Sequence, residues 1–220
     1  MNTRALNIFF AIAAIVAMSH LANEWVRMED PGGLVWKAAG IVLLGIFALL
    51  KRSWIAGLGL LFCALGDVLL ELVFVYGMAA FAVGHLFYIA AFVEWGRVLG
   101  LNKRDIPVAV IVVIISAGLL VWLFPGMGDL TGPAIAYQLI ITTMVCMAFI
   151  VKAPVLARLG AVLFMLSDTL IAAGRFANVD VPPGSVWITY AGAQILIAWG
   201  MSHIAPYRAR KKRQAAAAEA

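Results

Sequence analysis

The chain has 220 residues, of which 65% are hydrophobic and 12% are charged, and its formal net charge is +5. Soluble domains average about 45–50% apolar and about 25% charged residues, so this composition excludes an ordinary soluble domain and indicates an integral membrane protein. Long continuous apolar runs favour membrane helices over the alternating strands of a β-barrel. The basic residues lie at predicted helix ends and in the C-terminal tail, which argues against nucleic-acid binding.

Eight apolar runs are long enough to cross a bilayer, since a spanning helix needs about 20 predominantly apolar residues. Polar segments rich in Pro and Gly separate them and mark turns, the tightest at Tyr76-Gly77. We predict an all-α polytopic bundle of eight transmembrane helices at about residues 5–22, 33–50, 54–74, 77–95, 106–124, 133–151, 155–175 and 184–204. We expect residues 1–207 to form a single integral membrane domain and residues 208–220 to form a basic, Ala-rich cytoplasmic tail.

The Lys and Arg residues are distributed unequally between the two ends of such a bundle. Of the 16, all but Arg27, Lys37 and Arg175 lie in or beside the N-terminus, the second, fourth and sixth connections, or the tail. Cytoplasmic loops of membrane proteins carry an excess of Lys and Arg. We therefore expect both termini to be cytoplasmic, in a protein of the bacterial inner membrane.

Two acidic residues lie deep inside predicted spans. Asp67 falls within residues 54–74, and Asp168 falls within residues 155–175. A charged residue at the bilayer centre costs at least about 2.5–3.5 kcal/mol on insertion scales, so it usually faces the bundle interior, a partner or a water-filled site. We therefore interpret both Asp residues as functional.

The segments that precede the two Asp residues resemble each other. Residues 59–67 and 160–168 each run from Gly through an apolar stretch to a small residue and Asp, at an offset of 101 positions. In the spans that follow, His85 corresponds loosely to Gln194. Four spans separate the matching segments, so we predict two four-helix parallel repeats with a shared site at their interface.

Further polar residues gather near the depth of the two Asp residues, in the half of the bundle opposite the termini. They are His20, Asn23, Lys37, Glu71, His85, Tyr88, Tyr137, Gln138, Arg175, Tyr190 and Gln194. Polar residues placed for solubility would not collect at one depth. Singly, each has a structural interpretation: Tyr, Gln and His residues join helices by hydrogen bonds, and Lys37, Glu71 and Arg175 could extend to the interface.

The sequence predicts no metal site and no organic cofactor. Cys63 and Cys146 both fall in the middle of predicted spans, where a thiol acts as a small hydrophobic group. His85 alone supplies too few ligands for zinc.

Four motifs in order carry a family resemblance: Gly66-Asp67, His85-x-x-Tyr88, Ser167-Asp168 and Tyr190-x-x-x-Gln194-x-Leu196-Ile197. Together they resemble the YhhN-type lysoplasmalogenase family of eight-span membrane proteins, over nearly the whole chain. The chain departs from that family's pattern at Lys37-Ala38, where the family tends to have Pro after the Lys. It also departs at Thr189-Tyr190, where the family favours paired Tyr residues.

The resemblance implies hydrolysis of the vinyl-ether bond of a lysoplasmalogen, or of a related lyso-ether phospholipid, to a fatty aldehyde and a glycerophospho-head group. The reaction needs one protonated carboxyl and one carboxylate, and two neighbouring carboxyls in an apolar site divide into such a pair. We expect Asp67 and Asp168 to be this pair, without assigning the acid, and His85 to orient one of them or to relay a proton.

The other polar residues are expected to bind the substrate. Tyr190 and Gln194 would hold the substrate oxygen or the water, and Lys37 and Arg175 would meet the phosphate. Glu71 and Tyr88 complete the predicted substrate-binding set. The sequence leaves the head group, the chain and the oligomeric state open.

Two other functions fit the same carboxylates. A proton-coupled transporter of a small molecule or lipid also uses repeats with Asp residues near the bilayer midplane. Eight short-looped spans are few for such a carrier, and the polar groups occupy one half of the membrane only. A non-catalytic lipid-binding or assembly subunit would use the Asp residues merely to join helices.

Overall fold

The computed structural model describes residues 2–218, and this part of the chain is helical apart from short connections. The helices are α1 (Thr3–Ser19), α2 (Asn23–Val26), α3 (Gly32–Leu50), α4 (Trp54–Leu72), α5 (Phe74–Leu99), α6 (Ile106–Leu123), α7 (Thr131–Ile150), α8 (Val155–Ala177), α9 (Ser185–Met201) and α10 (Ala205–Ala218). A 3₁₀ turn at His20–Ala22 continues α1 into α2. The predicted all-α class is confirmed.

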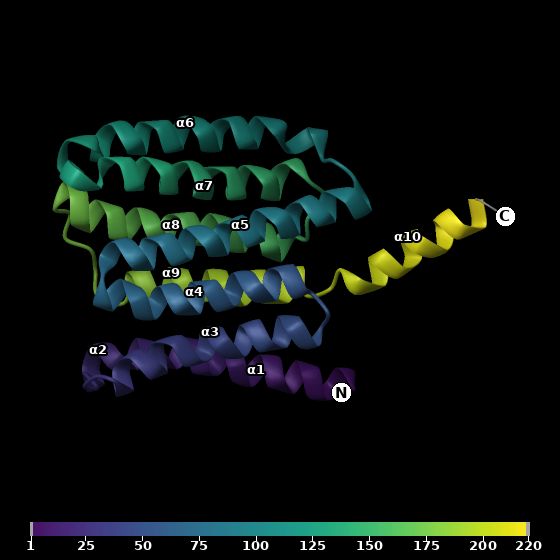
Figure 1. The fold of residues 1–220 in the computed structure, drawn as a ribbon, viewed down its shortest axis with the longest axis horizontal. Coiled ribbons are helices and arrows are strands. Elements are labelled where there is room, and N and C mark those ends of the chain that lie inside the picture. Colours follow the sequence, from purple (N-terminus) through teal and green to yellow (C-terminus); the bar gives the residue numbers. More distant parts are fainter. Residues whose placement is uncertain (1, 219–220) are drawn as a thin grey trace.

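The long helices run side by side along one axis, and both chain ends lie at the same end of the bundle (Figure 1). Among the described residues, seven helical segments are long and apolar enough to cross a membrane. The predicted eighth span corresponds to α9, whose 17 residues lie at the lower end of the range for a spanning helix. α9 packs along α8 in the middle of the bundle, whereas α6 forms its outer edge (Figure 1).

The turn between α4 and α5 lies at Val73, not at Tyr76-Gly77 as predicted. Val73 is the single extended residue between the two helices, and α5 begins at Phe74. Gly77 lies inside α5, where a Cβ atom would come within 2.4 Å of the Cα atom of Leu70. This glycine therefore permits close packing within the hairpin and does not form the turn. α5 is consequently longer at both ends than the predicted residues 77–95.

The last predicted span and the residues after it correspond to two helices. α9 ends at Met201, three residues before the predicted end of that span, and α10 starts at Ala205. Arg208 forms an ion pair with Glu94 of α5 and donates a hydrogen bond to the Arg52 carbonyl. The first turns of α10 are therefore attached to the bundle, and the rest of the helix projects away from it (Figure 1).

Close packing within two helix pairs supports the predicted repeat. A Cβ atom on Gly59 of α4 would lie 3.2 Å from the Gly84 carbonyl of α5, and one on Gly160 of α8 would lie 2.8 Å from the Ala193 carbonyl of α9. Gly84 directly precedes His85, and Ala193 directly precedes Gln194, so the two contacts lie at corresponding positions of the repeat. Membrane helices approach closely at such small residues, so α4–α5 and α8–α9 are equivalent hairpins in this respect.

Candidate functional site

A cavity of about 560 Å³ lies at the end of the bundle opposite the termini. It is bounded by α2, the outer ends of α3, α4 and α8, the start of α9, and the loop at residues 181–184. Its polar lining comprises His20, Asn23, Glu24, Arg27, Lys37, Asp67, Glu71, Ser167, Asp168 and Tyr190. Five of the predicted site residues, both Asp residues among them, therefore line one cavity.

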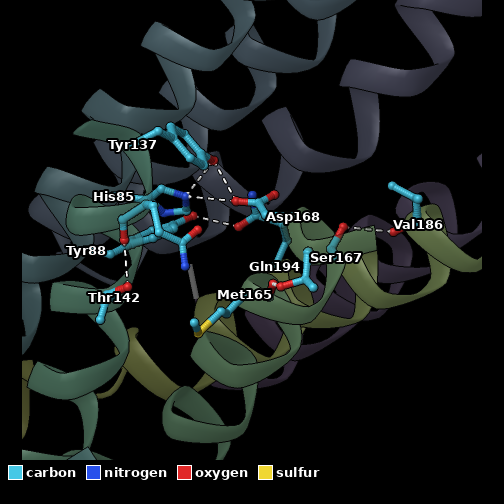
Figure 2. A network of polar contacts seen from close by, with 11 residues as sticks. His85, Tyr88, Tyr137, Thr142, Met165, Ser167, Asp168, Val186 and Gln194 are labelled. Atoms are coloured by element: carbon cyan, nitrogen blue, oxygen red, sulfur yellow. Dashed lines mark hydrogen bonds and ion pairs between the residues drawn. The ribbon is translucent and has the colours of Figure 1, made fainter. Parts of the chain in front are cut away.

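The small residue before each Asp brings a neighbouring helix close to it. A Cβ atom on Gly66 would lie 2.8 Å from the Phe81 ring of α5. Ser167 is fully buried, and its hydroxyl donates to the Val186 carbonyl of α9 over 3.1 Å (Figure 2). The repeated motif of a small residue followed by Asp thus joins two helices where each carboxyl enters the cavity.

Asp67 lies at the inner end of the cavity and is 2% exposed. The Tyr190 hydroxyl of α9 donates to Oδ2 of Asp67 over 2.7 Å. One helical turn further out, Glu71 accepts from Nζ of Lys37 over 2.5 Å, and this ion pair joins α4 to α3. The spacing of four residues places Asp67 and Glu71 on one face of α4, as predicted.

Asp168 is the centre of a second polar cluster, which Figure 2 shows. The Tyr137 hydroxyl of α7 donates to Oδ2 of Asp168 over 2.6 Å and lies 3.0 Å from Nε2 of His85. The distance from Nε2 of His85 to the same Asp168 oxygen is 3.5 Å. The His85 side chain is fully buried, whereas that of Asp168 is 17% exposed. His85 therefore lies behind Asp168, within reach of its carboxylate but outside the cavity lining.

Tyr88 and Gln194 form a separate pair deeper in the bundle. The Tyr88 hydroxyl donates to Oε1 of Gln194 over 2.6 Å, and both side chains are fully buried. Neither residue is part of the cavity lining. The pair joins α5 to α9. His85 lies about one turn before Tyr88 on α5, and Tyr190 lies about one turn before Gln194 on α9, so the pair is adjacent to the candidate site.

An aromatic cluster closes the cavity on its inner side. Phe164 of α8 precedes Asp168 by one turn and is fully buried. Its ring centroid lies 4.5 Å from that of His85, 5.3 Å from that of Tyr190 and 6.2 Å from that of Phe81. Apolar and aromatic packing therefore begins directly beneath the two carboxyls.

Within residues 2–218, no group of three or more His, Cys, Asp or Glu side chains is placed to share one ion. The functional groups of the site are carboxyls, phenols, an imidazole and an ion pair, which suit proton transfer.

The sequence of this chain matches the model of the YhhN family over residues 32–201, a range that contains every predicted site residue. The chain belongs to the YhhN family. It is 35% identical over 182 residues to a lysoplasmalogenase of Mycobacterium bovis, with 75% of this chain and 68% of that protein covered. It is 34% identical over 201 residues to the lysoplasmalogenase TMEM86B of Sus scrofa, with 81% of this chain and 80% of that protein covered. No solved structure matches the chain at a significant level.

A second pocket of this YhhN protein is apolar and adjoins the first. It measures about 70 Å³ and lies between α5 on one side and α7, α8 and the end of α6 on the other. The two pockets share Leu70, Phe81, Asp168 and Ile171. Asp168 is thus exposed to a polar space on one side and to an apolar space on the other.

Arg175, like Tyr88 and Gln194, is a predicted substrate-binding residue that does not line the polar cavity. Its guanidinium carbon lies 3.9 Å from the centre of the Phe74 ring at the start of α5, in a cation–π contact. Phe74 lines the apolar pocket, and Arg175 is not among the residues that line the polar cavity. The predicted contact of Arg175 with a substrate phosphate therefore has no support in the YhhN fold.

Several residues of the site, among them Tyr137, His20 and Arg27, were not assigned a role from the sequence. Tyr137 and His20 share the depth of the two Asp residues, but depth alone does not reveal which neighbour a side chain faces. His20 packs between the Trp36 and Trp187 rings, with centroid distances of 5.6 and 4.5 Å. Arg27 follows the short helix α2, which the sequence pattern did not predict.

Proposed function

We propose that this YhhN protein hydrolyses the vinyl-ether bond of a lysoplasmalogen, or of a related lyso-ether lipid, to a fatty aldehyde and a glycerophospho-head group. The observation that carries the proposal is one polar cavity lined by Asp67 and Asp168, each of which accepts a hydrogen bond from a phenol. The relatives named lysoplasmalogenase support the reaction class.

The proposed reaction begins with proton transfer from a carboxylic acid to the alkene carbon that is not bonded to oxygen. The other alkene carbon becomes an oxocarbenium ion, which a carboxylate stabilises. Water adds to this carbon and gives up a proton to the carboxylate, and the product is a hemiacetal. The carboxyl that took this proton then protonates the ether oxygen, the bond between that oxygen and the carbon breaks, and the hemiacetal hydroxyl gives its proton to the carboxyl that acted first. These transfers release the aldehyde and the glycerol hydroxyl, consume one water and return both carboxyls to their starting states.

We assign the carboxylate role to Asp168 and the acid role to Asp67. Asp168 receives the Tyr137 hydrogen bond and lies 3.5 Å from His85, and both neighbours favour a negative charge. Asp67 is almost fully buried and accepts one hydrogen bond from a side chain, that of Tyr190. A neutral carboxyl is the less costly form at a position shielded from solvent.

The head group belongs in the outer part of the cavity. Lys37 and Arg27 line this region and can pair with a phosphate, and Glu71 is the partner that Lys37 already holds. We therefore assign phosphate binding to Lys37 and Arg27, in place of the predicted pair of Lys37 and Arg175.

We also propose that the protein lies in a bacterial inner membrane with both termini cytoplasmic. Lys51, Arg52, Lys103, Arg104 and Lys152 lie at the end of the bundle that carries the termini. An excess of Lys and Arg is typical of cytoplasmic loops. In this orientation the cavity opens toward the outer leaflet.

The test incubates purified protein with a 1-alkenyl lysolipid and, as a control, with the saturated 1-alkyl analogue, which has no vinyl-ether bond. We expect aldehyde from the alkenyl lipid alone, with one deuterium at the carbon beside the aldehyde when the reaction runs in D₂O. Asp67→Asn and Asp168→Asn should each lower kcat by about 10²–10⁴-fold, the usual contribution of a general acid or base.

Gel filtration and thermal melting of both Asn variants serve as folding controls. Folded Asn variants that retain wild-type activity would contradict the assignment of the two Asp residues. A folded wild type that releases no aldehyde but moves a solute against a proton gradient in proteoliposomes would overturn the proposal in favour of a transporter.

A further inference from the structure

We propose that the apolar pocket between α5 and α7–α8 is the binding site for the hydrocarbon chain of the substrate, and that the chain enters it laterally from the bilayer. This proposal rests on the proposed function and identifies where the chain lies during the reaction. The expected ligand is one unbranched alkenyl chain of a lysolipid.

The first argument is continuity. The apolar pocket and the polar cavity share Leu70, Phe81, Asp168 and Ile171, so the two spaces meet at the Asp168 carboxyl. A lysolipid changes from polar to apolar at its vinyl-ether group. A lipid with its head group in the polar cavity and its chain in the apolar pocket therefore has its reactive bond beside Asp168.

The second argument is the chemistry of the lining. Met78, Phe81, Leu123 and Phe176 contribute apolar surface, and Met side chains adapt to irregular gaps. Tyr137 lines this pocket as well, and its hydroxyl is already donated to Asp168. Gln138, the other polar side chain of the lining besides Asp168, already donates to the Ser116 hydroxyl of α6. The pocket thus offers mainly apolar surface to a hydrocarbon chain.

The third argument is size. The pocket measures about 70 Å³ and can hold only the first carbons of a long chain. Phe74, Met78 and Phe176 are only partly buried, so the pocket reaches the surface of the bundle between α5 and α8. The remainder of the chain would then extend into the surrounding lipid, and the substrate need not leave the bilayer to bind.

A matched pair of substitutions on α7 tests the chain site. Ala134 is 8% exposed and lines the pocket, whereas Ala136, two residues later, is exposed on the opposite side of the helix. Ala134→Phe fills the pocket, and Ala136→Phe adds the same side chain outside it. Ala172→Phe fills the pocket from α8 and serves as the second variant if Ala134→Phe does not fold.

The measurement compares kcat/KM for a long-chain alkenyl lysolipid with kcat/KM for the ethenyl analogue, which has no carbon beyond the double bond. We expect Ala134→Phe and Ala172→Phe to lower the ratio of the two values by about tenfold or more, since each buried CH₂ group contributes to binding. Ala136→Phe should keep the wild-type ratio. Folded pocket variants that also keep that ratio would overturn the proposal.

A binding measurement separates this proposal from the proposed function. A saturated 1-alkyl lysolipid with a diazirine on its third chain carbon should crosslink wild-type protein within residues 74–81, 134–138 or 171–176, which line the pocket, and Ala134→Phe should lose these crosslinks. Crosslinks in this pocket without any turnover of the alkenyl lipid would refute the hydrolase and leave the chain site standing. Crosslinks confined to residues outside the lining of the pocket would refute the chain site whether or not turnover occurs.

Discussion

The two carboxyls of the site are held by phenols from different helices. Tyr137 of α7 donates to Asp168, and Tyr190 of α9 donates to Asp67. Removing either hydroxyl takes a hydrogen bond from one carboxyl and leaves the other intact, so the two Phe variants probe the Asp residues separately.

Tyr137→Phe and Tyr190→Phe should therefore lower kcat to different extents. A hydrogen bond to a charged group contributes about 1.5–3 kcal/mol, and about 1.4 kcal/mol in the barrier corresponds to a tenfold change in rate. Tyr137→Phe should lower kcat by about tenfold or more, because Asp168 acts as the charged carboxylate and loses its phenol donor.

Tyr190→Phe should lower kcat less than Tyr137→Phe, because a neutral Asp67 depends less on a donated hydrogen bond than a charged carboxylate does. His85, Lys37 and Glu71 remain in both variants, so each variant serves as the control for the other. A larger loss of kcat in Tyr190→Phe than in Tyr137→Phe would exchange the roles of the two Asp residues.

Single residues also show how far the sequence could predict the site. The position of Asp67 and Asp168 at one cavity was predictable, because a carboxyl inside an apolar span usually faces the bundle interior or a water-filled site. Arg175 lies seven residues beyond Asp168, or about 10 Å further along the helix axis, and so reaches Phe74 instead of the cavity. The partnership of Tyr137 with Asp168 depends on the rotation of α7, and no residue pattern in α7 specifies that rotation.

At the scale of helices, a glycine can form a turn or permit two helices to pack closely, and the sequence does not distinguish these two functions. Gly77 resembled a turn residue, yet it lies within α5 against Leu70, and Val73 makes the turn. Gly160 was predicted within a repeated motif, and its packing against Ala193 agrees with that repeat. Repetition in the sequence was thus a better guide than the residue type.

The packing of α8 against α9 leads to a stability prediction. A Cβ atom on Gly160 would lie 2.8 Å from the Ala193 carbonyl and 3.0 Å from the Ile197 backbone nitrogen, so the two helices must separate. Gly160→Ala should lower the free energy of unfolding by about 1–3 kcal/mol, the usual cost of overpacking. A thermal melt in detergent measures this change.

Gly118 in α6 provides the matched control. A Cβ atom there would have no neighbour within 4 Å, apart from the helix's own backbone. Gly118→Ala should leave the melting temperature unchanged or raise it, since Ala favours a helix by about 1 kcal/mol over Gly. Equal melting temperatures for Gly160→Ala and the wild type would show that the α8–α9 contact is not close.

At the scale of the whole molecule, the order of the long helices was predictable because each lies in an apolar run. Eight spans were predicted, and seven segments of the described chain are long and apolar enough to cross a membrane. The enclosure of the cavity was not predictable, because α2 and the loop at residues 181–184 contain short polar and Pro-rich segments without a periodic pattern. Tertiary packing determines how such segments fold over the outer end of the bundle.

The orientation of the molecule leads to a topology prediction. With the termini in the cytoplasm, a green fluorescent protein fused after residue 220 should fluoresce, and alkaline phosphatase at the same point should be inactive. A cysteine introduced at Asp180, in the loop beside the cavity, should react with a membrane-impermeant maleimide in intact cells. Strong phosphatase activity together with an unlabelled cysteine would reverse the orientation.

The position of Phe164 has a consequence for the membrane as a whole. An energised membrane stores a proton gradient, and a continuous chain of exchangeable groups from one face to the other would discharge it. Phe164 lies one turn from Asp168, on the side toward the chain termini, and its ring packs against those of His85, Tyr190 and Phe81. Phe164 has no exchangeable proton, so a proton path of this kind could not run through its side chain.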